Sequence, residues 1–253
     1  MSKILAIHSF RGGTGKSNLT ANLGAIAAQQ GYRVGIVDTD LQSPGLHALF
    51  DVDPLTLPTC LNDYLNGRCS IVEAAHDVSD LLPQPVAGRL YLIAARIQLG
   101  DIAHTLSAGY DIERLSDGLD DLMAELQLDY LLIDTHPGIS EDTLVSITLA
   151  DALIVVLRPD RQDFQGTAVM VDVARRLQFP KLWLVVNRAL PMFDAIALEE
   201  QIAGTYHVAV AGVVPNADEM MQLASSGLFC AAHPDHPVSQ AIAAIGQQVF
   251  CRR

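Results

Sequence analysis

The sequence lacks any segment that could carry the chain across a membrane. None of its apolar runs reaches the roughly 18 residues that a spanning helix needs. The first residues, MSKILAIHSF, show no cleavage site and lead directly into a glycine-rich stretch. Its cysteines show no disulfide framework, and we therefore expect a cytoplasmic protein in a reducing compartment. These cysteines are Cys60, Cys69, Cys230 and Cys251.

Basic residues are also scarce. The chain has 16 Lys and Arg against 29 Asp and Glu, which gives a formal net charge of -13. Because nucleic acid binding needs clustered Lys and Arg, this balance argues against a general nucleic-acid-binding surface and leaves only a local patch open. We interpret the cations that lie close in sequence, Arg175, Arg176, Lys181, Arg252 and Arg253, as solvated helix faces.

What the chain does have is apolar content. Its 253 residues are 50% hydrophobic and 18% charged, enough for a large core within a single α/β domain. No internal repeat or low-complexity linker divides it. We expect one domain over residues 1–253.

The stretch from Ile4 to Gly31 joins three kinds of sequence in a fixed order. Ile4 to His8 is an apolar run typical of a buried strand. Ser17 to Gln30 carries apolar residues at helical spacing and stops at Gly31, which favours a helix. Between them lies RGGTGKS, Arg11 to Ser17. A strand, a glycine turn and a helix in this order predict a loop that holds an anion.

This loop matches the phosphate-binding pattern GxxxxGK(S/T) only in part, because Phe10 stands where the pattern begins with glycine. Its physical features nevertheless suit phosphate. Glycines let successive N–H groups converge, and the following helix adds unpaired amides and the positive end of its dipole. Lys16 can reach terminal phosphates, and the Ser17 hydroxyl can bind the accompanying Mg²⁺. We predict nucleotide contacts from Gly12, Gly13, Thr14, Gly15, Lys16, Ser17 and Asn18.

Carboxylates follow the next strand. Arg33 to Asp38 is a short apolar strand that runs into Thr39 and Asp40, which places two carboxylates at the ligand edge of a parallel sheet. Asp38 and Asp40 share a side while the strand persists, so one can orient water and the other can act on the metal shell. An ordinary polar strand exit is the alternative.

A third strand, Leu128 to Asp134, also ends on an aspartate and is followed by THPG. Asp134 can hold Mg²⁺ through water, and Gly138 can turn its N–H toward a terminal phosphate. This segment is therefore a candidate nucleotide sensor. For His136 we expect a structural or partner-contact role rather than that of a catalytic base.

The rest of the chain supplies further elements. We expect strands at 90–95, 152–157, 181–186 and 208–214, and helices at 60–66, 70–75, 111–126, 163–177, 219–226 and 238–250, with a short helix within 41–50. The segment 51–98 favours partner specificity over chemistry. Because the expected strands and helices alternate along the chain, we predict an α/β fold with a mostly parallel sheet.

Polar residues after the last two strands can receive a base. An asparagine at a strand's carboxyl end can pair with the adenine edge, since its amide both donates and accepts. The predicted base contacts are Asn187, Arg188, Pro215, Asn216 and Asp218. The CxxHxxH spacing of Cys230, His233 and His236 has no evident fourth ligand, and we do not predict metal there.

These motifs resemble the ParA/MinD family of P-loop ATPases, whose deviant Walker A loop reads KGGxGK(S/T). The likeness covers nearly the whole chain: RGGTGKS at 11–17, VDTD at 37–40, LLIDTHPG at 131–138, VVNR at 185–188 and GVVPNAD at 212–218. It implies a three-layer P-loop NTPase fold, with a mostly parallel twisted sheet of about seven or eight strands and helices on both faces. It also implies a switch in which two subunits enclose two ATP molecules and hydrolysis releases the dimer.

The same resemblance implies roles for single residues. Lys16 and the loop amides would hold phosphates, Ser17 and Asp40 would serve Mg²⁺, and Asp38 would orient the attacking water. Asp134 and Gly138 would form the second switch segment, and Asp134 would also serve the metal. Asn187 and the loop at Pro215 would contact adenine.

One position departs from the family pattern. The signature lysine, which in a dimer crosses to the other subunit's phosphates, falls at Arg11. Arginine keeps the charge and can contact phosphate bidentately, so Arg11 can act catalytically in trans as a finger. Because the guanidinium group is longer and planar, arginine is not equivalent to lysine at this position.

The resemblance implies a homodimer in the ATP state whose slow hydrolysis is stimulated by a protein partner. We expect it to position or partition a cellular structure, of cell-division, polar, flagellar, pilus, plasmid or chromosome type. Neither DNA nor membrane is favoured as the matrix, because the charge is negative and 238–253 lacks the pattern of a basic amphipathic helix. A scaffold with little hydrolysis remains open, as Arg11 suggests. A metal-cluster carrier or metabolic P-loop enzyme is the other alternative, although no Cys-x-x-Cys lies near the C-terminus.

Overall fold

Seven mainly apolar runs of five to eight residues and one two-residue segment pair into one central sheet. The structure is a computed structural model that describes residues 3–82, 85–96 and 111–250. Within them the sheet has eight strands in the order β3-β4-β2-β5-β1-β6-β7-β8, all parallel except that β3 pairs antiparallel with β4. The strands are β1 (Lys3–His8), β2 (Arg33–Asp38), β3 (His76–Asp77), β4 (Arg89–Ile93), β5 (Tyr130–Asp134), β6 (Ala152–Leu157), β7 (Leu182–Ala189) and β8 (Ala209–Pro215).

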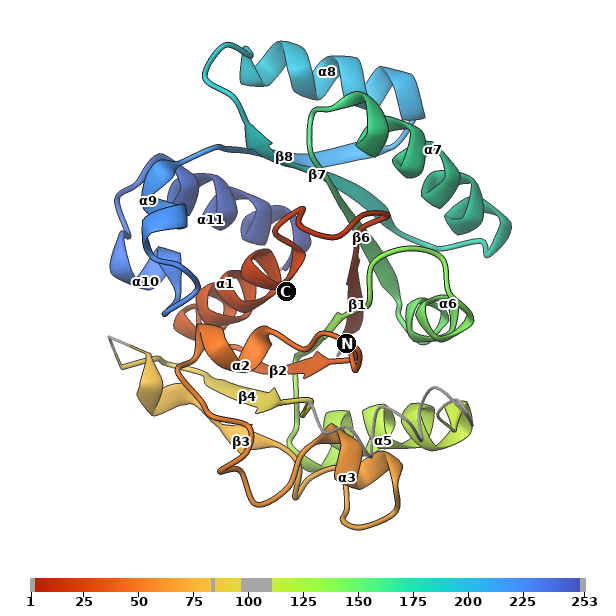
Figure 1. Ribbon diagram of the computed structural model, residues 1–253, viewed down its shortest axis with the longest axis vertical. Helices are drawn as coiled ribbons and strands as arrows, with labels where there is room; N and C mark the ends of the chain where they lie inside the picture. The colour runs from red at the N-terminus through yellow and green to blue at the C-terminus, as the bar shows by residue number, and fades with distance from the viewer. Residues whose placement is uncertain (1–2, 83–84, 97–110, 251–253) are drawn as a thin grey trace.

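Helices cover both faces of this sheet (Figure 1). Strand alternation divides the core: Leu5 and Ile7 pack with α1 and α11, whereas Ala6 between them packs with the opposite layer. One face carries α1 (Lys16–Gln29), α2 (Leu46–Leu49), α10 (Phe229–Ala232) and α11 (Pro237–Val249). The other carries α3 (Leu61–Leu65), α5 (Ile112–Glu125), α6 (Glu141–Thr148), α7 (Arg161–Arg176) and α8 (Ala195–Tyr206). The short helices η1 (Ser79–Leu81) and α9 (Asp218–Gln222) lie in connections.

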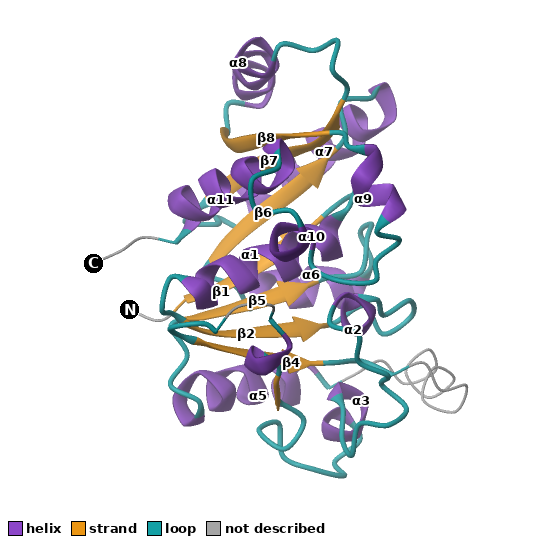
Figure 2. Cartoon of the chain, turned by 90° about the vertical axis from the view of Figure 1, so that its left-hand side faces the viewer, coloured by secondary structure: helices purple, strands orange, loops and turns teal. Residues whose placement is uncertain are grey.

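The parallel strands carry their loops to a common edge. In Figure 2 the strands β1, β2, β5 and β6 point toward the side where α2 and α9 lie. The loop from β1 to α1 and the residues that follow β2 and β5 therefore meet at one end of the sheet. This is the edge at which open α/β sheets bind ligands.

The predicted fold class is confirmed by this sheet and its two helix layers. The expected helix at 70–75 is wrong: the segment forms a turn in which the Ser70 N–H donates to Glu73 Oε2 at 2.7 Å, and the chain then enters β3. The expected helix at 219–226 ends at Gln222, because Ala224 and Ser225 adopt positive φ angles of 49° and 59°.

Several elements were not predicted, namely β3, η1, α6, α8 and α10. Cys251, Arg252 and Arg253 lie outside the described residues, as does 97–110. No helix in the described part of the chain combines the length and apolarity that a membrane span requires.

Candidate functional site

The loop between β1 and α1 is shaped by glycines. Gly13 and Gly15 have φ angles of 77° and 88°, which other residues rarely adopt. A Cβ on Gly15 would lie 2.3 Å from Asn187 Nδ2, so that only glycine fits there. No side chain caps the start of α1, which leaves the first N–H groups of the helix available to an anion.

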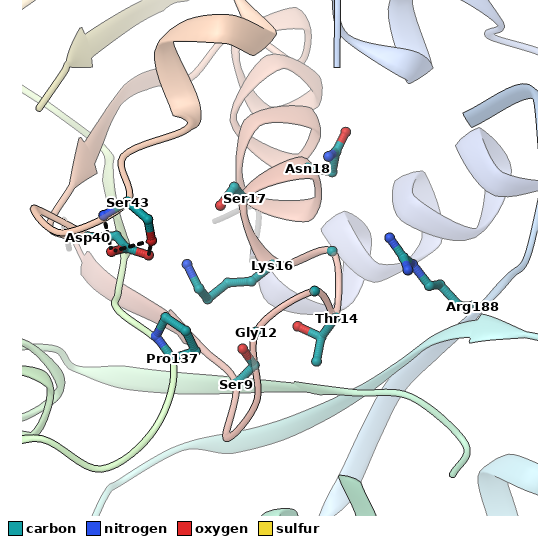
Figure 3. Close-up of a pocket in the computed structure, with 12 residues that line it drawn as sticks. Ser9, Gly12, Thr14, Lys16, Ser17, Asn18, Asp40, Ser43, Pro137 and Arg188 are labelled. Carbon is teal, nitrogen blue, oxygen red and sulfur yellow. Dashed lines mark hydrogen bonds between the residues drawn. The ribbon is translucent and has the colours of Figure 1, made fainter. Parts of the chain in front are cut away.

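This loop borders a cavity of about 260 Å³, here called the loop cavity (Figure 3). Its walls come from the ends of four strands, β1, β2, β5 and β7, and from the start of α1. They include all seven predicted loop residues, Gly12, Gly13, Thr14, Gly15, Lys16, Ser17 and Asn18, together with Ser9, Asp40, Ser43, Pro137 and Arg188. The structure therefore brings the predicted phosphate loop and one predicted carboxylate together.

A second cavity of about 260 Å³, the side cavity, shares Gly15, Asn18 and Arg188 with the first. Its other walls come from the ends of β7 and β8 and from α9. They are Asn187, Pro215, Asn216, Ala217, Met220, Met221, Ala224 and Ser225. Asp218 is exposed on α9 and lines neither cavity.

Asn187 holds the boundary between the two cavities. Its Nδ2 donates to the Thr14 carbonyl oxygen at 2.7 Å, and its Oδ1 accepts from the Arg188 N–H at 2.9 Å. Arg188 adopts a left-handed φ of 57°, which interrupts the regular register of β7 with β8. Asn187 is therefore fixed against the loop, while Arg188 lines both cavities.

Lys16 forms a buried salt bridge with Asp134. Its Nζ lies 2.7 Å from Asp134 Oδ1, and the side chains are 7% and 1% exposed. Thr20 Oγ1 donates to the same oxygen at 3.2 Å, whereas Asp134 Oδ2 is buried and has no hydrogen-bond partner among the described residues. The pair joins the phosphate loop to the end of β5 and leaves one carboxylate oxygen free to accept a further ligand.

Asp38 is buried at the end of β2 and does not line either cavity. Its Oδ2 accepts from the N–H groups of Gly45 and Leu46 at 3.0 and 3.2 Å, and its Oδ1 accepts from the Asp40 N–H at 3.2 Å. Burial raises the pKa of Asp38 to about 7, and the charge of Asp134 adds to the rise.

Asp40 faces different neighbours, because β2 ends at Asp38 and strand alternation stops there. Its Oδ1 accepts from the Ser43 N–H at 3.0 Å and lies 2.7 Å from His136 Nδ1. The predicted carboxylate pair is thus divided between a buried position and the wall of the loop cavity. His136 contacts that wall through Asp40.

Gly138 and Arg11 lie beside the cavities without lining them. Gly138 has a φ of 95°, and its N–H donates to the Ser9 carbonyl oxygen at 3.1 Å. Arg11 Nη1 donates to Gln162 Oε1 near the start of α7. Phe10 packs so closely on α7 that a Cβ on Gly166 would lie 2.1 Å from its ring.

Some wall residues were not predicted. Ser9, Ser43, Met220 and Met221 come from loops and from α9, and their positions depend on how distant segments meet. Ser43 alone had a sequence signal, since a hydroxyl in the turn after VDTD lies within reach of Asp40. In the cluster of Cys230, His233 and His236, the two imidazole rings pack against Phe229, with ring centroids 4.8 and 5.1 Å from that of Phe229. No group of three His, Cys, Asp or Glu that could hold a metal ion occurs in the described part of the chain.

Comparison with known proteins places the chain in a family. Residues 2–182 match the family model AAA_31, described as an AAA domain. The chain is 31% identical over 210 residues to the chromosome partitioning protein ParA of Caulobacter vibrioides, covering 79% of this chain and 74% of the relative. The chain belongs to the ParA/MinD family of P-loop ATPases.

Two further proteins are similar to the chain in sequence or in fold. An uncharacterized ATP-binding protein of Methanocaldococcus jannaschii is 28% identical over 254 residues, which cover 99% of this chain and 88% of the relative. The fold is similar to that of the septum site-determining protein MinD from Pyrococcus horikoshii, solved with Mg-ADP, with a TM-score of 0.82, 21% identity and coverage of 98% of this chain and 96% of that one. The predicted family and P-loop fold are confirmed.

Proposed function

We propose that this ParA/MinD member is an ATP-hydrolysing dimerisation switch that positions or partitions a cellular structure. The observation that carries the proposal is the pair of cavities that share Gly15, Asn18 and Arg188. The glycine loop and Lys16 line one of them, and Asn187 lines the other. A triphosphate suits the first because N–H groups and a lysine converge there, and a base suits the second because Pro215 and two methionines give that cavity apolar walls.

The chain's residues fit magnesium as well as nucleotide. Ser17 and Asp40 line the loop cavity, and the unpartnered buried Asp134 Oδ2 lies beside it on the Lys16 pair. Hydroxyl and carboxylate oxygens are the ligands that Mg²⁺ prefers, and Mg²⁺ when bound neutralises phosphate charge. We assign Ser17, Asp40 and Asp134 to the metal, directly or through water.

Lys16 and the N–H groups of 12–18 would hold the phosphates. Binding requires Lys16 to exchange or share its partner, because its ammonium now contacts Asp134. Asp38, fixed by three backbone N–H groups, would orient the attacking water. Gly138 would carry the sensor N–H. Since these groups position and stabilise charge rather than form covalent bonds, slow hydrolysis that a partner stimulates is expected.

Adenine contacts are assigned to Asn187, Arg188, Pro215 and Asn216, which wall the side cavity. Asp218 has no part in this assignment, because it is exposed away from both cavities. Arg11 keeps its assignment as a finger that acts on the phosphates of a second subunit.

A protein is the favoured cargo or partner. The net charge of -13 disfavours DNA, and α11 has no basic residue in its last turn and buries one face in the core. We therefore propose recognition of a protein assembly rather than of a nucleoid or a lipid surface.

ATPase rate and oligomeric state, measured without nucleotide and with Mg-ADP or Mg-ATP, test the proposal. We expect a dimer only with Mg-ATP, hydrolysis that needs Lys16, and loss of both dimer and turnover in Arg11→Ala, while the exposed-cation control Arg176→Ala behaves as wild type. Parallel samples with DNA or liposomes test the choice of matrix. A monomer under every condition would contradict the switch, and normal dimerisation and turnover in Arg11→Ala would remove the finger role.

A further inference from the structure

A third cavity lies at the opposite edge of the sheet. It has a volume of about 220 Å³ and is lined by residues at the amino ends of β1, β6 and β7. In Figure 2 these strand ends lie on the side opposite to α2 and α9. None of its lining residues belongs to the loop cavity or the side cavity. We call it the amino-edge cavity.

Strand register explains how this cavity forms. Leu5 pairs with Ala152, and Trp183 pairs with Ile154 two residues further along β6. Because side chains two apart share a face, Leu5, Ala152 and Trp183 all face the layer of α1 and α11. Val249, the last residue of α11, lines the cavity from the helix layer. The result is an apolar floor with an aromatic wall.

Two lysines stand at the mouth. Lys3 is two residues before Leu5, and Lys181 is two residues before Trp183, so both follow the same face. Lys181 Nζ lies 5.6 Å from the centre of the Trp183 ring. Neither ammonium forms a salt bridge with a carboxylate among the described residues. Asp151 also lines the cavity, and its Oδ2 accepts from the Ile4 N–H at 2.9 Å.

The position of these lysines is unusual for this chain. The sequence has three lysines in all, Lys3, Lys16 and Lys181, within a net charge of -13. One serves the phosphate loop, and the other two line the amino-edge cavity. Two lysines without a carboxylate partner among the described residues, beside a largely apolar lining, are complementary to a molecule with a hydrophobic body and an acidic end.

We propose that the amino-edge cavity binds a small aromatic anion, an aryl carboxylate or sulfonate. The ring occupies the floor against Trp183, and the acid contacts Lys3 and Lys181. The volume lies below the roughly 300 to 1,000 Å³ of sites for drug-sized ligands, which sets the size at one or two rings. This site is independent of the proposed ATPase, because it lies at the other edge of the sheet.

The chain contains one tryptophan, which lies in this cavity and gives a single indole N–H resonance in a ¹H–¹⁵N spectrum. Titration with 2-naphthoate is expected to shift that resonance saturably, with affinity at least fivefold above that of the neutral 2-naphthamide. Lys3→Gln and Lys181→Gln are each expected to weaken naphthoate three- to tenfold and leave naphthamide unchanged. The control Arg176→Gln, an exposed cation elsewhere, leaves both affinities unchanged.

Two further experiments test whether naphthoate binds in this cavity and not in the nucleotide site. Ala152→Leu is expected to fill the cavity and abolish the shift, with a dispersed spectrum showing that the variant is folded. Saturating Mg-ATP is expected to leave naphthoate binding intact. No saturable shift at millimolar naphthoate, equal affinity for the amide, or loss of the shift on addition of Mg-ATP would each overturn the proposal.

Discussion

Gly15 combines two constraints at one residue. Its φ of 88° is left-handed, and a Cβ there would lie 2.3 Å from Asn187 Nδ2. Gly15→Ala is therefore expected to lower the free energy of unfolding by about 1–3 kcal/mol, through backbone strain and steric overlap, and to weaken Mg-ATP binding. Denaturant titration and nucleotide calorimetry measure both effects.

Two variants separate these causes. Adding Asn187→Ala to Gly15→Ala removes the overlap and should recover part of the stability, whereas the φ strain remains. Gly204→Ala is the matched control, because Gly204 lies in α8 with no atom within 4 Å of the place that an added Cβ would take, and it should gain about 0.5–1 kcal/mol. Equal losses at both glycines would contradict the steric account.

His8 is a buried titratable group in which only one ring nitrogen, Nδ1, has a hydrogen-bond partner among the described residues. Thr135 Oγ1 donates to the Ile7 carbonyl oxygen at 3.0 Å, so His8 Nδ1 must donate to that hydroxyl at 2.8 Å. His8 Nε2 is buried without a partner in the described chain. Burial, with the charges of Lys16 and His136, lowers the pKa of His8 to about 3.

His8→Asn is expected to flatten the acid side of the stability profile. Between about pH 6.5 and 3 the unfolded chain binds the histidine proton and the folded chain does not, so the stability present above pH 6.5 is lost as pH falls. The slope of this loss is up to about 1.4 kcal/mol per pH unit for one proton, and it is absent in the variant. Urea titrations at pH 7, 6 and 5 measure it. Asp38, whose raised pKa acts in the opposite direction, is common to both proteins and cancels in the difference. Parallel profiles for the two proteins would contradict the prediction.

At the scale of elements, α7 holds the segment that precedes the phosphate loop. Gly166 lets Phe10 pack against the helix, and Gln162 accepts a hydrogen bond from Arg11. If Arg11 acts on a second subunit, it must first leave Gln162. The first turn of α7 therefore holds Arg11 in a position that competes with its proposed role.

Gln162→Ala is expected to lower the dissociation constant of the Mg-ATP dimer about three- to tenfold. In this variant Arg11 no longer has to break its hydrogen bond to the Gln162 side chain before it reaches the second subunit. Sedimentation equilibrium with Mg-ATP measures the dissociation constant. Unfolding should change little, since Gln162 is exposed. Gln165→Ala, exposed on the same helix, is the control. An unchanged dimer constant in Gln162→Ala would show that Arg11 is not restrained by α7.

The sequence predicted the strands better than the short helices. A parallel strand buried on both faces appears as a continuous apolar run, and Arg33–Asp38 was predicted with its observed bounds. By contrast, α8 was not predicted, because its apolar residues do not lie on one face: Ile196 is exposed while Leu198 is buried. Strand β3 has only two residues and exists through its pairing with β4, which no local pattern reveals.

At the scale of the whole molecule, the same limit applies to the site. The loop residues were predictable because their glycine, lysine and serine spacing is local. The partner of Lys16 is 118 residues away and that of Arg11 is 151 residues away, so these contacts depend on the order of strands in the sheet. The methionine wall of the side cavity likewise depends on where α9 packs. Residue types were therefore foreseeable, whereas their pairings required the assembled fold.

The Lys16–Asp134 pair links the stability of the whole fold to the charges of the candidate site. Both groups are buried, so removing the lysine leaves a carboxylate without a counter-charge. Lys16→Met is expected to lower the free energy of unfolding of the nucleotide-free protein by about 3–5 kcal/mol. Asp134→Asn in the same chain should restore most of this loss, since the remaining groups are neutral. Denaturant titration of the two single variants and the double variant measures the coupling.

A surface pair provides the comparison for this cycle. Arg89 and Asp77 lie 3.4 Å apart with side chains 49% and 40% exposed, and Arg89→Met should change stability by no more than about 1 kcal/mol. If Lys16→Met were as mild as Arg89→Met, Asp134 would have another source of stabilisation, and the loop and β5 would not be coupled through this pair. If it is severe and Asp134→Asn rescues it, the phosphate loop is linked to the end of β5 in the nucleotide-free state. Mg-ATP would then act on the fold by replacing that contact, because it offers Lys16 a phosphate and Asp134 a metal ion.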